Sequence, residues 1–67
     1  MARATATETS GLDLRLLRTS HRLTVTAVAN AAGWSRQRGS AIEATERPTR
    51  RAIARYLAAI EAAAEAR

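Results

Sequence analysis

Arginine is the side chain in this sequence best suited to holding a ligand, and the arginines are concentrated in one stretch. The 67 residues include 11 basic residues, all arginine, against six acidic ones, which gives a net charge of +5. Six of the arginines fall between residues 36 and 55, at Arg36, Arg38, Arg47, Arg50, Arg51 and Arg55. Only two glutamates share this stretch, so it carries a net charge of +4. Guanidinium groups bind phosphate oxygens through paired hydrogen bonds, and the stretch therefore predicts a polyanionic partner such as double-stranded DNA.

Most other chemistry is excluded by what the sequence lacks. It has no cysteine, and His21 is the only histidine, so zinc fingers, disulfide frameworks, thiol nucleophiles and histidine-containing triads cannot be assembled. A chain of this length buries only about 60% of the surface of its unfolded form and has little room for a catalytic cleft. We therefore expect no enzyme, no metal or other cofactor and no small-molecule ligand.

A membrane or exported protein is not expected either. Charged residues interrupt every apolar stretch well before the roughly 18 residues that a membrane span requires. The first ten residues are polar and lack the apolar core of a signal peptide. We expect a cytoplasmic protein.

Four helices are predicted to position the arginines. The composition is rich in alanine and contains no alternating β-branched run, which favours an all-α domain. Ser10, Thr24 and Ser35 are placed as N-caps. Pro48 and Thr49 are predicted to separate the third helix from the last one. We expect a flexible N-terminus at residues 1–10 and one small domain at residues 11–67, with helices at about 12–21, 24–32, 35–44 and 49–66.

The centre of the chain is typical of a helix-turn-helix. Between residues 24 and 42, two short helical patterns flank the break Gly33-Trp34-Ser35. In such a motif Ala29 must be small because the second helix crosses it, and Gly33 takes the left-handed turn conformation. An apolar wedge between the helices is predicted from Val28, Ala32 and Ile42.

These residues resemble the Cro/repressor (Xre-like, lambda-repressor-like) helix-turn-helix family over about residues 12 to 60. The resemblance rests on Leu17-Arg18, Leu23-Thr24, Val28-Ala29, Ala32-Gly33-Trp34-Ser35, Ser40, Ile42-Glu43 and Pro48. It implies a DNA-binding transcriptional regulator of the phage repressor or Cro type, acting as a homodimer on half-sites about 34 Å apart. It also implies a partly buried ion pair between Arg18 and Glu43, for which the alternative is two solvated surface charges.

One position departs from the family pattern. Gly39 stands where relatives carry a large aliphatic residue, and glycine within a helix costs about 1 kcal/mol relative to alanine. Our hypothesis is that Trp34 folds over the space that Gly39 leaves. The alternative is an indole on the surface, in contact with DNA or a partner.

The predicted third helix supplies the residues that would read DNA sequence. With this helix in the major groove, the expected base contacts are Arg36, Gln37, Ser40 and Ala41. The expected phosphate contacts, which set register without reading sequence, are Thr24, Arg38, Arg47, Arg50 and Arg51. The helix dipole disfavours cations in the first turn of a helix, so helix stability does not account for the arginines placed there. These are Arg36, Arg38, Arg50 and Arg51.

The last helix is the candidate dimer surface. An apolar stripe is predicted at Ile53, Leu57, Ile60 and Ala64. Glu61 and Glu65 are like charges near the helix end, which an arginine from a second subunit would offset; the alternative is that both are simply solvated. The dimerisation candidates are Leu57, Ile60, Glu61 and Ala64. Two alternatives remain open: a protein-interaction module that uses Trp34 and the last helix, and an antitoxin-like or excisionase-like architectural DNA-binding protein.

Overall fold

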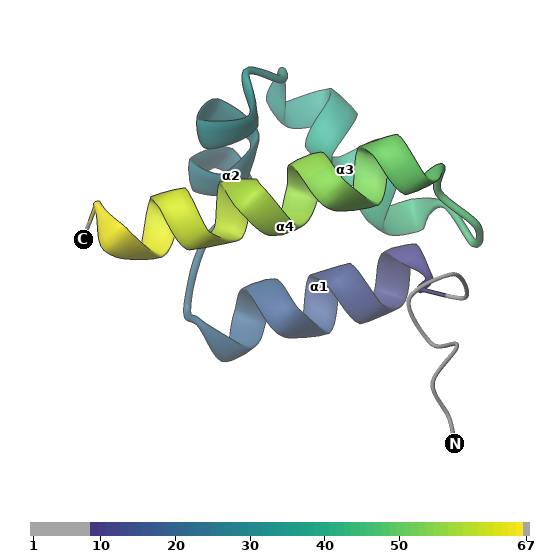
Figure 1. Ribbon diagram of the computed structural model, residues 1–67, viewed down its shortest axis with the longest axis horizontal. Coiled ribbons are helices and arrows are strands. Elements are labelled where there is room, and N and C mark those ends of the chain that lie inside the picture. The colour runs from purple at the N-terminus through teal and green to yellow at the C-terminus, as the bar shows by residue number, and fades with distance from the viewer. Residues whose placement is uncertain (1–8, 67) are drawn as a thin grey trace.

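The computed structural model describes residues 9–66, and over this range the chain is an all-α domain (Figure 1). Its four helices are α1 (Gly11–Ser20), α2 (Val25–Ala32), α3 (Arg36–Ala44) and α4 (Arg50–Glu65). The predicted fold class is confirmed, and the helix bounds agree with the expected ones to within about one residue. Of the segment expected to be flexible, residues 1–8 lie outside the described residues. None of the helices within residues 9–66 is long and apolar enough to cross a membrane.

Each helix begins at a hydroxyl side chain. Ser10, Thr24, Ser35 and Thr49 each accept a hydrogen bond from the backbone N–H three residues further on, at 3.1–3.2 Å. At Ser10 the bond is reciprocated, because its own N–H donates to the carboxylate of Asp13 at 3.0 Å. Such caps stabilise a helix by about 1 kcal/mol each, so the four helix starts are fixed by local sequence.

The core lies where α4 crosses the other helices. In Figure 1 α4 runs across α2 and α3, with α1 alongside it. The core cluster contains Leu14 of α1, Leu23 of the α1–α2 turn, two residues of α2 and five of α4: Val28, Ala32, Ile53, Tyr56, Ala59, Ile60 and Ala63. Trp34 and Ile42 pack against its edge. The second helix of the motif, α3, contributes no fully buried side chain, and Gly39 is its one buried residue.

The buried face of α4 differs from the predicted stripe. Ile53 and Ile60 are buried as expected, but Leu57 is 40% exposed and Ala64 is only partly buried. Tyr56 takes the central place and is fully buried. The prediction is wrong at Leu57 and missed Tyr56, because it chose the positions by helical spacing and apolarity. A tyrosine can occupy a core when its hydroxyl finds a partner, which Tyr56 does.

The turn between α2 and α3 has the predicted helix-turn-helix geometry. Gly33 adopts the left-handed conformation with φ 77°, and the N–H of Trp34 donates to the carbonyl of Ala29 at 2.8 Å. Val28 and Ala32 are buried, and Ile42 packs partly buried against them. The turn therefore fixes the direction in which α3 leaves α2.

The hypothesis that Trp34 covers Gly39 is wrong. A Cβ built on Gly39 would lie 3.2 Å from the Cβ of Ala29 and 3.3 Å from Cγ2 of Val25, both in α2. The missing side chain is thus replaced by the close approach of the two helices. Trp34 instead lies beside Tyr56, with ring centroids 6.4 Å apart.

Candidate nucleic-acid interface

A partly buried ionic network anchors α3 to the rest of the domain. Arg18 of α1 donates from Nε to Oε2 of Glu43 at 2.6 Å and from Nη2 to Oε1 at 3.1 Å, so the ion pair is bidentate. Its remaining Nη1 donates to the carbonyl of Leu23 at 2.8 Å. From α4, the hydroxyl of Tyr56 donates to the same carboxylate. One glutamate therefore joins α1, α3 and α4, and the predicted Arg18–Glu43 pair is confirmed.

The network shifts the titration of its members. Burial by itself raises the pKa of Glu43, but the hydrogen bonds from Arg18 and Tyr56 outweigh this and hold the pKa below its usual range. Burial and the adjacent carboxylate raise the pKa of Tyr56. The hydrogen bond to Glu43 raises the pKa of Arg18. The pair therefore stays ionised and the tyrosine stays neutral around neutral pH.

The outward face of α3 carries the residues that were expected to read bases. Arg36, Gln37, Ser40 and Ala41 are all exposed and lie in the first two turns of the helix, which starts at the Ser35 cap. None of them takes part in the core cluster. Their side chains are thus available to a partner that approaches this face.

The expected phosphate contacts come from three parts of the chain. Thr24 caps α2, Arg38 lies in α3, and the others lie in the α3–α4 connection or the first turn of α4: Arg47, Arg50 and Arg51. All five are exposed. Within residues 9–66 none of these arginines forms an ion pair, because the Arg18–Glu43 bridge is the one salt bridge there.

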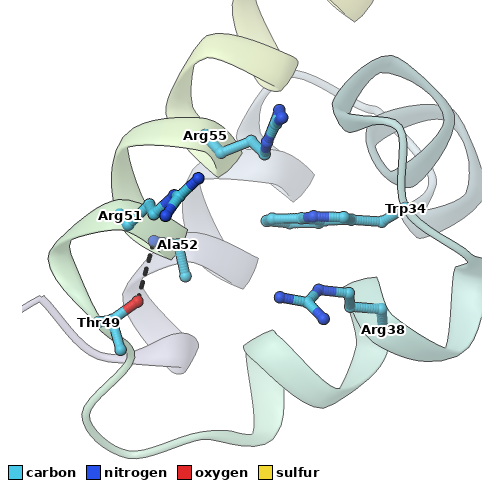
Figure 2. A pocket seen from close by; sticks show the side chains of 6 residues that line it. All are labelled: Trp34, Arg38, Thr49, Arg51, Ala52 and Arg55. Carbon is cyan, nitrogen blue, oxygen red and sulfur yellow. Dashed lines mark hydrogen bonds between the residues drawn. The ribbon is translucent and has the colours of Figure 1, made fainter.

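Beside α3 the arginines meet Trp34 in a hollow of about 300 Å³ (Figure 2). The indole lies between Arg38 on one side and the side chains of Arg51 and Arg55 on the other. The guanidinium carbon of Arg38 is 5.5 Å from the ring centroid, within the range of a cation–π contact. Thr49 and Ala52 complete the wall.

Sequence reasoning missed two residues of this region. Arg55 was counted in the charged stretch but given no contact, although its i, i+4 spacing from Arg51 places both on one face of α4. Tyr56 was given no role at all. Its partner Glu43 lies 13 residues away, and no local spacing rule links them.

The candidate dimer surface is partly retained. Leu57, Glu61 and Ala64 line a second hollow between α1 and α4, together with Leu17 and His21. Leu17 and Leu57 are 38% and 40% exposed. Ile60, the fourth candidate, also lines this hollow, but it is only 3% exposed and belongs to the core cluster with Ile53 and Tyr56.

No family model, curated protein or solved structure matches this chain. Within residues 9–66 there is also no cluster of three or more histidine, aspartate or glutamate side chains that could hold a metal ion. The sequence and the geometry of the arginine-rich face are therefore the grounds for assigning a function.

Proposed function

We propose that this protein is a sequence-specific DNA-binding regulator of the repressor type. In this proposal α3 enters the major groove, and Arg36, Gln37, Ser40 and Ala41 meet base edges. The phosphate contacts named above hold the helix in register on the backbone. Two copies of the chain bind one operator, with the Leu17–Leu57 hollow as the candidate contact between them.

One observation carries the proposal: the arginines of α3, of the α3–α4 connection and of the first turn of α4 are exposed and form no salt bridge within residues 9–66. Each arginine in the first turn of α3 or α4 faces the positive end of a helix dipole, which costs about 0.3 to 1 kcal/mol. Within residues 9–66 no carboxylate forms a salt bridge with these arginines. A DNA backbone supplies the missing anions, and positive helix ends bind phosphate well.

The two kinds of contact predict different results on mutation. Arg36→Ala is expected to weaken binding to the preferred duplex by about 1 to 3 kcal/mol and to relax the choice of base at one position. Arg50→Ala is expected to weaken binding to all duplexes alike and to lower the salt dependence by about one released ion. Fluorescence anisotropy at several salt concentrations, on duplexes selected from a random pool and on scrambled duplexes, measures both effects.

The same titration tests the function as a whole. A preference of about a thousandfold or more for the selected duplex, with two chains per duplex, supports a dimeric regulator. Weak, steeply salt-dependent binding to every duplex would replace it with an architectural DNA-binding protein. Equal losses on every duplex for Arg36→Ala and Arg50→Ala would contradict the assignment of base contacts.

A protein-interaction module is the second candidate, and a different observation favours it. Four leucines are exposed within residues 9–66, namely Leu12, Leu16, Leu17 and Leu57. Leu12 and Leu16 are each 57% exposed and lie one turn apart on α1. Stoichiometric binding of a protein partner with no affinity for any duplex would select this function.

A further inference from the structure

The hollow around Trp34 is lined mainly by basic side chains. Its wall contains three guanidinium groups, from Arg38, Arg51 and Arg55, and one indole, and it contains no carboxylate. Arg38 comes from α3 and the other two from α4, so the fold brings together charges that are 13 and 17 residues apart in the sequence. Like charges repel at this range, and folding alone gives no reason to collect them.

The arrangement favours an anion with several oxygens. The three arginines make no ion pair within residues 9–66, so their donors are available to a ligand. The Thr49 hydroxyl accepts from the Ala52 N–H at 3.1 Å and can still donate its own proton into the hollow. The residues around the hollow therefore offer hydrogen-bond donors from at least four side chains and no competing negative charge.

The indole argues against a stacked base. Figure 2 shows the Trp34 ring between the side chains of Arg38 and Arg55, and Arg38 lies over the ring at 5.5 Å. A nucleobase could stack there only by displacing a guanidinium. The ring instead holds the Arg38 guanidinium in place by the cation–π contact. The N–H groups of Arg38 then stay free to donate to a ligand.

We propose that the Trp34 hollow is a phosphate-binding site that grips one phosphodiester group of a nucleic-acid backbone, with Arg55 as a ligand beside Arg38 and Arg51. This deepens the proposed function and rests on it for the source of the phosphate. It adds Trp34 and Arg55 to the interface and assigns Arg38 and Arg51 to a single phosphate. A free diphosphate offers the same chemistry, and the test separates the two sources.

Trp34 is the only tryptophan in the chain, so its fluorescence reports directly on this site. The probes are inorganic diphosphate and a mixed-sequence DNA duplex, and each is titrated at several salt concentrations, with the ionic strength held constant within each titration. For the full chain we expect both to change the indole emission. Arg55→Gln is expected to abolish the response to diphosphate, to weaken the duplex by about tenfold and to lower the salt slope by about one.

Arg22→Gln is the matched control. It removes the same charge from an exposed arginine in the α1–α2 turn that does not line the hollow. We expect it to leave the diphosphate response unchanged. Arg38→Gln is expected to repeat the loss seen with Arg55→Gln, and circular dichroism of each variant checks that the helices are intact.

The outcomes separate the site from the function. A diphosphate response that depends on Arg55, without affinity for any duplex, supports a free-phosphate site and overturns DNA binding. Duplex binding with neither an Arg55-dependent salt slope nor an indole response overturns the site and keeps DNA binding. Failure of both probes overturns both.

Discussion

Replacing Glu43 with alanine is expected to lower the free energy of unfolding by about 3 to 5 kcal/mol. The Glu43 side chain is 9% exposed and Arg18 is 13% exposed, so the substitution leaves a guanidinium partly buried without its counter-ion. It also leaves the Tyr56 hydroxyl without its acceptor. A domain of this size has a total stability of about 3 to 10 kcal/mol, so a substantial fraction of the variant unfolds. Urea denaturation followed by circular dichroism measures the loss.

A double-mutant cycle shows whether the loss belongs to the ion pair. Arg18→Ala and Glu43→Ala are each expected to be costly, and the double variant to be less unstable than the sum of the two. Tyr56→Phe keeps the ring in the core and is expected to lose about 1.5 to 3 kcal/mol, the value of a hydrogen bond to a charged group. Additive losses for Arg18 and Glu43 would show that the two side chains do not interact in solution.

The same carboxylate makes stability depend on pH. The folded-state pKa of Glu43 is lowered, so its contribution is fully present above its unfolded value of about 4.3 and is lost as the pH falls through the folded-state pKa. We expect the free energy of unfolding to fall as the pH drops below about 5. Glu43→Gln is expected to flatten this part of the curve. An unchanged slope in that variant would assign the acid sensitivity to other groups.

The second large effect is expected at Gly11. This residue opens α1, and its N–H donates to the carbonyl of Thr45 at 2.8 Å just after α3 ends. A Cβ built there would lie 2.6 Å from the carbonyl carbon of Glu43 and would overlap the carbonyl oxygens of Ile42 and Glu43. Backbone atoms cannot rotate away as a side chain can. Gly11→Ala is therefore expected to push α1 from α3 and to cost about 3 kcal/mol.

Gly39→Ala is the matched control for Gly11→Ala. Its Cβ would meet two side-chain atoms at 3.2 and 3.3 Å rather than backbone, and alanine gains about 1 kcal/mol in helix propensity. These terms oppose each other, so a change of under about 1 kcal/mol is expected. Thermal and urea unfolding of both variants make the comparison. Equal stability of Gly11→Ala and the parent chain would show that the close contact between α1 and α3 is absent in solution.

The parts of the fold that follow local rules were predictable from sequence. A hydroxyl side chain just before a helical pattern accepts a hydrogen bond from the backbone N–H three residues further on. Ser10, Thr24 and Ser35 therefore mark where their helices begin. Gly33 indicates the turn after α2 because the left-handed conformation needed there favours glycine. The exposure of Arg36 and Gln37 could be predicted because Ile42, the large apolar residue of the same helix, packs against the core.

The features that sequence could not supply depend on segments distant in the chain. The buried position of Tyr56 could not be predicted because the acceptor of its hydroxyl, Glu43, lies in another helix. Gly11 reads as an ordinary helix start until the end of α3 is packed against it. Arg55 reads as one more solvated charge until α4 crosses beside Trp34. In each case the deciding neighbour lies in a different helix or turn.

The outward side of α3 has a consequence for how such a chain can evolve. Positions 36, 37, 40 and 41 are exposed and contribute nothing to the core, while Gly39, Ile42 and Glu43 on the other side hold the helix in place. Exposed substitutions of this kind usually change stability by no more than about 0.5 kcal/mol. If α3 reads DNA as proposed, a lineage can exchange the four outward side chains by single steps and change the preferred duplex while every intermediate still folds.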